Sequence, residues 1–239
     1  FLSTGIVFCQ TELGFDFDYA RFKYDSNSVY LEFYYSLNSK DMVMNKYENG
    51  KMSEAIVHIE MKNSLVDSFF INKDYKIQNI ITENDSSNGQ AGLTGVFGFP
   101  IPKGKYSLLV KTWDANNPSF SKTIKENVEI QPYDNKFEIS DIELASNIKK
   151  DNVDAKSLFY KNTYEVIPNP SMLYSKQTPI AFYYAELYNL TDSSEATDFT
   201  LQKTLFNSAG VSVFKNSRII KQIKNSIVEV GTVNLAKYA

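Results

Sequence analysis

Apolar and polar residues alternate with a period of two along most of this chain. The clearest example lies between the turn residues Pro102–Gly104 and Asp114–Pro118. One face of this segment carries Tyr106, Leu108, Val110 and Thr112, and the other carries Ser107, Leu109, Lys111 and Trp113. A period of two between turn signals predicts a β-strand with one buried face.

The same pattern recurs in short segments from end to end. In the first half we expect strands at residues 15–24, 29–37, 42–47, 54–62, 75–82, 93–99, 106–113 and 125–130. In the second half we expect strands at residues 163–167, 178–190, 197–207, 211–214, 218–221 and 226–235. Isoleucines near helical spacing between Arg218 and Ile227 allow a helix, but their β-branched side chains favour two strands and a turn.

Many short strands separated by turns are typical of β-sandwiches. We therefore predict an all-β protein of two tandem immunoglobulin-like or fibronectin-like sandwich domains, at residues 12–133 and 134–239, joined near Gln131–Asn135. The second domain is expected to lack its last strand, because the first continues from the comparable point through Pro102–Tyr106 into a final strand. An unpaired strand edge of this kind invites pairing with another chain.

Two strands resemble each other across the halves. The segment from Val29 to Asn38 reads VYLEFYYSLN, and the segment from Pro179 to Asn189 reads PIAFYYAELYN. Each follows a polar turn and comes early in its half. We expect each Phe-Tyr-Tyr strand to occupy the same central place in its own sheet.

The amino-acid composition argues against several classes of function. The formal net charge is −3 without a block of like charge, which argues against nucleic-acid binding. One cysteine and one histidine exclude a disulfide framework within the chain, a cysteine-based zinc site and a multi-histidine metal site. The histidine, His58, falls on the polar face of its strand, so we expect a solvated side chain and predict no catalytic residue, metal site or cofactor.

The first residues are apolar or small. Residues 1–11 read FLSTGIVFCQT, and we interpret them as a signal-peptide remnant, with a plain N-terminal strand as the alternative. Cys9 as a lipid-anchored residue is less favoured, because Val7 and Phe8 are not the small residues such a site needs. No apolar run reaches the length of a transmembrane segment.

Four residues are candidates for an interaction site. Ser140 and Asp141 open the second half; we expect them to bond a local backbone N–H, with Ile142 and Leu144 anchoring the interdomain joint, or else to form a partner-binding edge. Glu186 shares a strand face with Phe182, Tyr184 and Tyr188. A carboxylate there needs a hydrogen-bonding partner such as a tyrosine hydroxyl, and we favour that structural role over catalysis.

Trp113, the fourth candidate, is the sole tryptophan. It could cover the outer face of one sheet, pack against the other domain, or stay exposed to stack on a sugar, in that order of preference. The loops Asn84–Asn88 and Asp192–Glu195 carry oxygens that calcium could use, but neither has calcium-loop spacing, so we expect solvated loops. Pro168 and Pro170 predict a rigid corner between strands.

Several motifs together resemble the N-terminal region of exported bacterial GWxTD-domain proteins. They are Phe15–Phe22, Val29–Leu37, Pro102–Tyr106, Ile139–Ala145, Ile167–Ser171 and Phe182–Tyr188. The defining Gly-Trp-x-Thr-Asp motif does not occur in the sequence and would be expected downstream. The resemblance implies export and tandem β-domains and implies no reaction.

The sequence therefore predicts a non-enzymatic, exported structural or interaction protein of a bacterial envelope or surface assembly. Binding to a protein partner, or self-assembly, would use strand edges and aromatic patches. One alternative is a carbohydrate-binding module that uses exposed tyrosines and Trp113. Another is an accessory region of a longer enzyme.

Overall fold

The protein is all-β. The computed structural model describes residues 12–40, 42–66, 68–82, 92–191, 198–221 and 224–238. The strands of the first half are β1 (Phe15–Lys23), β2 (Ser28–Leu37), β3 (Asn45–Tyr47), β4 (Gly50–Asn63), β5 (Phe69–Thr82), β6 (Leu93–Pro102), β7 (Gly104–Asp114) and β8 (Asn117–Ile130). Those of the second half are β9 (Glu138–Ile139), β10 (Glu143–Lys149), β11 (Tyr160–Lys161), β12 (Tyr164–Pro168), β13 (Ile180–Tyr188), β14 (Asp198–Phe206), β15 (Ser212–Lys221) and β16 (Ile227–Asn234).

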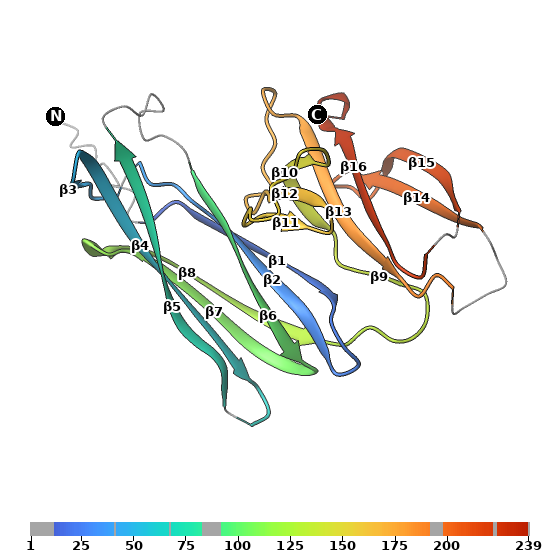
Figure 1. The fold of residues 1–239 in the computed structure, drawn as a ribbon, viewed down its shortest axis with the longest axis horizontal. Coiled ribbons are helices and arrows are strands. Elements are labelled where there is room, and N and C mark those ends of the chain that lie inside the picture. Colours follow the sequence, from blue (N-terminus) through green and yellow to red (C-terminus); the bar gives the residue numbers. More distant parts are fainter. Residues whose placement is uncertain are drawn as a thin grey trace, which may run out of the picture. The chain divides into compact units, whose positions relative to one another are not determined.

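The strands form antiparallel sheets, as expected for β-sandwich architecture (Figure 1). In the first half, one sheet has the order β1-β2-β6, and a second has the order β3-β4-β7-β8 with β5 also on β4. In the second half, one sheet has the order β11-β12-β10-β13-β16 with β9 on β13, and β14 pairs with β15. Among the described residues the one helical turn is η1 (Leu235–Lys237), and no helix is long and apolar enough to cross a membrane.

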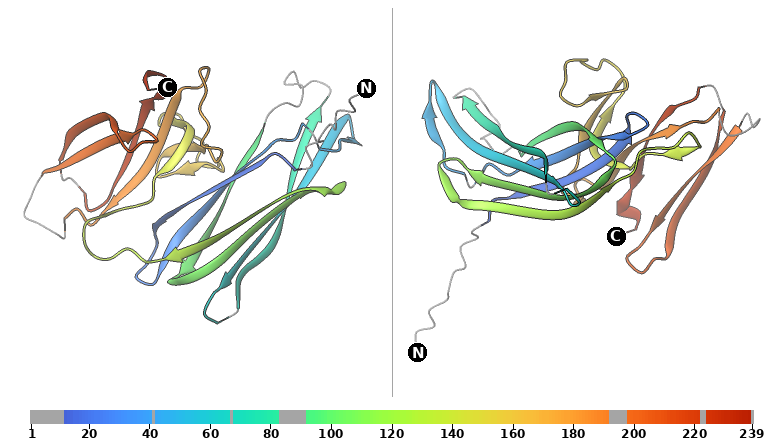
Figure 2. Two further views of the ribbon diagram at one scale, coloured as in Figure 1. Left: turned by 180° about the vertical axis from the view of Figure 1, so that it is seen from behind. Right: turned by 90° about the horizontal axis from the view of Figure 1, so that it is seen from below.

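The chain folds into two compact units that do not follow chain order. The first contains residues 1–17, 35–94 and 103–130, and the second contains residues 18–34, 95–102 and 131–239. The predicted domain boundary near residue 133 stays a prediction. Figure 2 shows the ribbon from behind and from below.

The first unit owes its core to the predicted alternation. On β4, Ala55, Val57, Ile59 and Met61 are fully buried. On β7, Tyr106, Leu108 and Val110 are buried as well, on the face that the sequence predicted. The in-register pairing of β4 with β7 brings these positions side by side, Ile59 opposite Val110 and Met61 opposite Leu108. One apolar face on each strand therefore builds a continuous buried layer.

The second unit has its own core around β13. Its buried residues are Ala20, Phe22, Tyr34, Ala145, Val166 and Tyr184. The prediction for the Phe-Tyr-Tyr strands is confirmed, because β2 lies between β1 and β6 while β13 lies between β10 and β16. Central strands are buried on both faces, which suits their aromatic composition.

Two strands predicted near the C-terminus are one. Residues 211–214 and 218–221 were expected to be separate, but β15 runs from Ser212 to Lys221 without a break. Its backbone pairs with β14 from Ser212 opposite Phe206 to Lys221 opposite Asp198. This ladder holds the polar residues Lys215–Ser217 in extended conformation, so their polarity does not end the strand. The preference for strands and a turn over a helix at residues 218–227 is confirmed, with the turn at Lys224–Ser226.

Candidate functional site

Ser140 and Asp141 bond backbone N–H groups of distant strands. Ser140 is buried, and its Oγ accepts from the N–H of Glu186 at 2.9 Å. Asp141 Oδ2 accepts from the backbone N–H and from Nε of Arg21, at 3.0 and 2.7 Å. These bonds to Glu186 and Arg21 connect distant parts of the chain, and the hydroxyl of Ser140 also donates locally to the carbonyl of Asp141. Ile142, which follows them, is 58% exposed, and the predicted interdomain anchor stays a prediction.

Glu186 has the tyrosine partners that its position demands. Its Oε1 accepts from the hydroxyl of Tyr184 at 2.5 Å and from Nδ2 of Asn162 at 2.8 Å. Its Oε2 accepts from the hydroxyl of Tyr188 at 2.8 Å. Burial first, and the neighbouring Glu186 charge second, raise the pKa of both tyrosines above the ordinary tyrosine value. The carboxylate is therefore satisfied as an acceptor from neutral hydroxyls, which supports a structural role.

Trp113 and His58 lie on the outer face of the β4-β7 pair. Trp113 is half-buried, and Nζ of Lys111 lies 5.5 Å from the centre of its ring. The Nδ1 atom of His58 lies 2.7 Å from a carboxylate oxygen of Asp74 on β5. The tryptophan ring is partly covered on this outer face, and the choice among its three predicted placements stays a prediction.

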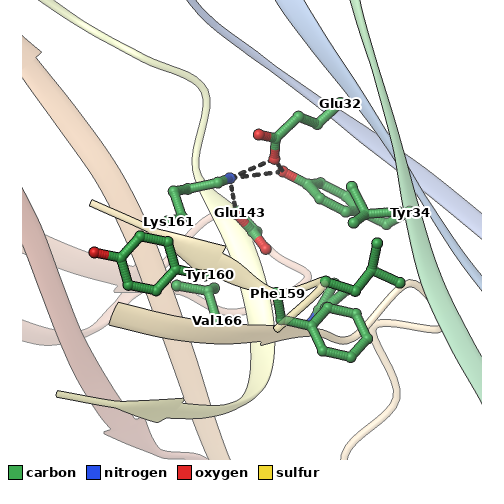
Figure 3. A pocket seen from close by; sticks show the side chains of 10 residues that line it. Glu32, Tyr34, Glu143, Phe159, Tyr160, Lys161 and Val166 are labelled. Carbon is green, nitrogen blue, oxygen red and sulfur yellow. Dashed lines mark hydrogen bonds and ion pairs between the residues drawn. The ribbon is translucent and has the colours of Figure 1, made fainter. Parts of the chain in front are cut away.

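The second unit holds a buried charge cluster that sequence reasoning missed (Figure 3). Lys161 on β11 extends between Glu32 of β2 and Glu143 of β10 and makes an ion pair with each, at 2.7 Å to Glu143. The hydroxyl of Tyr34 donates to Glu32 at 2.7 Å. We call these four side chains the lysine cluster. Glu32 is only 8% exposed, and the ammonium of Lys161 pairs with it there.

Burial dominates the electrostatics of the lysine cluster. Loss of water raises the pKa of the Glu143 carboxyl, and the positive charge of Lys161 partly opposes that rise. Burial also raises the pKa of Tyr34, to which the negative charges of Glu143 and Glu32 add. The ammonium of Lys161 lies 4.0 Å from the ring centre of Phe22, so the cation is held by carboxylates and aromatic faces together.

The lysine cluster has charged groups but no room for a substrate. The cavity beside it is about 40 Å³, far below the ~300–1,000 Å³ of typical ligand pockets. No cysteine or histidine lines it, and within the described parts of the chain no group of acidic, histidine and cysteine side chains could hold a metal ion. The cluster therefore fixes β11 against β2 and β10. No local sequence pattern predicts the lysine cluster, because Glu32 and Lys161 lie 129 residues apart in the chain.

An apolar groove is another candidate site of the second unit. It has a volume of about 340 Å³ and lies between the β10-β13-β16 sheet and the hairpin β14–β15. The side chains that line it are mostly apolar and include Ile139, Ile142, Leu144, Leu201, Leu205 and Phe214. Ile139 and Ile142 are 48% and 58% exposed, so one wall of the groove is open to solvent.

Strand order explains why the groove is open. In the first half, β4 pairs with β5 on one edge and with β7 on the other, and β7 pairs with β8. In the second half, β14 pairs with β15, and no other described strand pairs with β14. The second half thus leaves a strand edge and an apolar wall uncovered, while the predicted absence of its last strand stays a prediction.

Three further sequence predictions fall outside the described residues. These are Cys9 with the rest of residues 1–11, and the possible calcium loops at Asn84–Asn88 and Asp192–Glu195. Pro168 ends β12, and no peptide bond of the described residues is cis.

No protein-family model matches the chain, and no curated protein matches it.

Proposed function

We propose that this chain is a non-enzymatic interaction protein that binds an extended segment of a protein partner along β14. The observation that carries the proposal is the apolar groove beside the unpaired edge of β14. A strand added there would pair its backbone with β14 and turn alternate side chains into the groove. That segment would take the place that β7 takes beside β4.

The groove residues suit a strand with alternating apolar side chains. Leu201 and Leu205 lie on one face of β14, four residues apart, and line the groove together with Leu144 and Ala185. Lys203 lies between them, with its Nζ 5.0 Å from the ring centre of Tyr183. The groove is therefore apolar at its ends and carries a cation at its middle.

The test uses a groove variant and a matched surface variant. Ile142→Asp places a charge in the open wall, and Ile219→Asp places the same charge on an exposed isoleucine of β15 outside the groove. Complexes are cross-linked in the native source, purified and analysed by amide hydrogen exchange. We expect slowed exchange along β14 in the complex, and loss of the complex only with Ile142→Asp. Unchanged β14 exchange, or equal loss with both variants, would contradict strand addition.

We also propose that the protein is located outside the cytoplasm. The apolar segment at residues 1–11 and the resemblance to exported bacterial proteins support a place in a bacterial envelope or surface assembly. Fractionation of native cells, followed by mass spectrometry of the mature N-terminus, tests this. A mature chain that retains its N-terminal segment in the cytoplasmic fraction would contradict it.

A further inference from the structure

The lysine cluster brings one amine and two carboxyl groups into contact inside the second unit. Nζ of Lys161 donates to Glu143 at 2.7 Å and also to the carboxylate of Glu32 (Figure 3). The side chain of Lys161 is 15% exposed and that of Glu143 is 1% exposed. Buried ions of this kind lose their hydration, and their mutual attraction has to offset that loss. An amine and a carboxyl group held together away from water are also the two reactants of an amide bond.

Aromatic rings enclose the amine. The ring centres of Phe22, Tyr184 and Tyr34 lie 4.0, 4.8 and 5.7 Å from Nζ of Lys161. Surroundings of low polarity disfavour charged groups relative to neutral ones, because they replace little of the lost hydration. Conversion of the ion pair into a neutral amide would remove both charges from this site. The environment therefore favours the product of condensation over its charged reactants.

The turn after Lys161 holds the amine in position. Asn162 and Thr163 have φ angles of 45° and 73°, a left-handed conformation that is rare for a β-branched residue such as threonine. Nδ2 of Asn162 donates to the hydroxyl of Tyr184 at 2.7 Å and to Glu186 at 2.8 Å, which ties the β11–β12 hairpin to β13. Reacting groups that are already held in contact pay little further entropy to meet.

We propose that the lysine cluster modifies itself, forming an amide bond between Nζ of Lys161 and Cδ of Glu32 with release of water. The C–N bond forms as one C–O bond of the Glu32 carboxyl breaks. Of the three protons on the ammonium, one stays on the amide nitrogen and two leave with the departing oxygen as water. Charge also balances, because the positive ammonium and the negative carboxylate both become neutral. The step needs no oxidant, reductant or second substrate.

Glu143 and Tyr34 have separate parts in this step. Glu143 takes a proton from Nζ, which frees the nitrogen lone pair for attack, and passes that proton to the departing oxygen. Burial raises the pKa of Glu143, so its carboxyl is suited to holding the proton in between. The hydroxyl of Tyr34 donates to Glu32 at 2.7 Å and stabilises the negative charge that attack places on the carboxyl oxygen.

The small cavity beside the lysine cluster can receive the released water. Glu32, Tyr34, Glu143 and Lys161 all line it, and its volume is about 40 Å³. A water molecule needs about 10–15 Å³ measured in this way. The new bond would join β2 to β11 covalently, across 129 residues of chain. This inference is independent of strand addition at β14, since none of these residues lines the groove.

Mass spectrometry of the recombinant full chain under denaturing conditions tests the proposal. We expect a mass lower than that of the sequence by one water molecule, and a branched tryptic peptide that joins Glu32 to Lys161. Lys161→Arg keeps the positive charge but removes the amine, so this variant should have its full sequence mass. Lys149→Arg is the matched control, because Lys149 pairs with Glu165 near the surface, and it should keep the mass deficit.

Two further variants separate the parts of the carboxyl groups. Glu143→Gln removes the proton carrier and should reduce the linked fraction about tenfold or more. Glu32→Gln keeps the carbon that is attacked, so it should form the same amide with loss of ammonia in place of water. An unlinked native chain, a mass deficit that persists in Lys161→Arg, or loss of water from Glu32→Gln would each overturn the proposal.

Discussion

Arg21 of β1 and Asp141, two residues before β10, are joined by hydrogen bonds in both directions although 120 residues separate them in the chain. The guanidinium and the backbone N–H of Arg21 both donate to the carboxylate. Asp141 returns a bond from its own N–H to the carbonyl of Arg21, and the hydroxyl of Tyr133 donates to that same carbonyl. The hydrogen bonds that the guanidinium donates to Asp141 raise the pKa of Arg21 above its ordinary value.

Asp141→Asn should destabilise the protein by about 1–2 kcal/mol. The variant keeps an acceptor for one N–H but loses the charge and the paired geometry that the guanidinium requires. Both side chains are about one third exposed, which lowers the cost below that of a buried pair. Urea unfolding measures the change. Asp134→Asn is the control, since its ion pair with Lys136 is well exposed, and an equal effect of both substitutions would contradict a special role for Asp141.

Lys161→Met should be the most damaging change in the lysine cluster. It leaves Glu32 and Glu143 buried without a cation, and breaking a buried pair costs about 3–5 kcal/mol. At acidic pH the variant should recover part of this lost stability, because the two carboxylates take up protons. Urea unfolding measures the change. Lys149→Met is the control, because Lys149 pairs with Glu165 on the surface. If both lysines proved equally dispensable, the lysine cluster would not hold β11 in place.

Glu143→Gln should change the pH dependence of stability in a defined direction. Burial raises the pKa of the Glu143 carboxyl above its ordinary value, so the folded protein takes up this proton more readily than the unfolded chain. The contribution of this carboxyl to stability is therefore greatest in acid and is lost as pH rises through the raised pKa. Compared with Glu143→Gln, the native protein should gain stability as pH falls from neutral.

The control for this pH effect has the opposite sign. Hydrogen bonds from Lys149 and Ser157 lower the pKa of Glu165, so its contribution is present above the unfolded pKa and is lost as pH falls. Compared with Glu165→Gln, the native protein should lose stability in acid. Urea unfolding midpoints of the native protein and of both variants, measured from neutral to acidic pH, test these two predictions. Two differences of the same sign would contradict the burial of Glu143.

The alternation of side chains predicted the strands but not the contacts between them. Val29, Leu31, Phe33 and Leu37 are fully buried, as their period of two requires. The opposite face of the same strand is buried as well, because Lys161 covers Glu32, and no local pattern carries that information. The role of Glu186 was predictable, since a carboxylate among tyrosines needs their hydroxyls. The apolar groove was not, because it depends on which strands pair and which edges stay open.

Gly231→Ala should destabilise the second unit, because Tyr183 lies directly opposite Gly231 across the β13-β16 pair. A methyl group at Gly231 would overlap the hydroxyl oxygen of Tyr183 and lie 2.7 Å from its Cζ. The ring cannot move freely, since its hydroxyl donates to the buried Glu229 at 2.7 Å. Such overpacking costs about 1–3 kcal/mol, which thermal or urea unfolding would detect.

Two controls isolate the contact between Tyr183 and Gly231. Gly92→Ala should have little effect, because a methyl group there would meet only the carbonyl oxygen of Leu37, at an ordinary 3.8 Å. In a Tyr183→Ala background the ring is gone, so Gly231→Ala should lose most of its cost, and the double-mutant cycle gives the coupling between the two positions. An undiminished cost in that background would mean that the glycine is needed for its backbone and not for the ring that covers it.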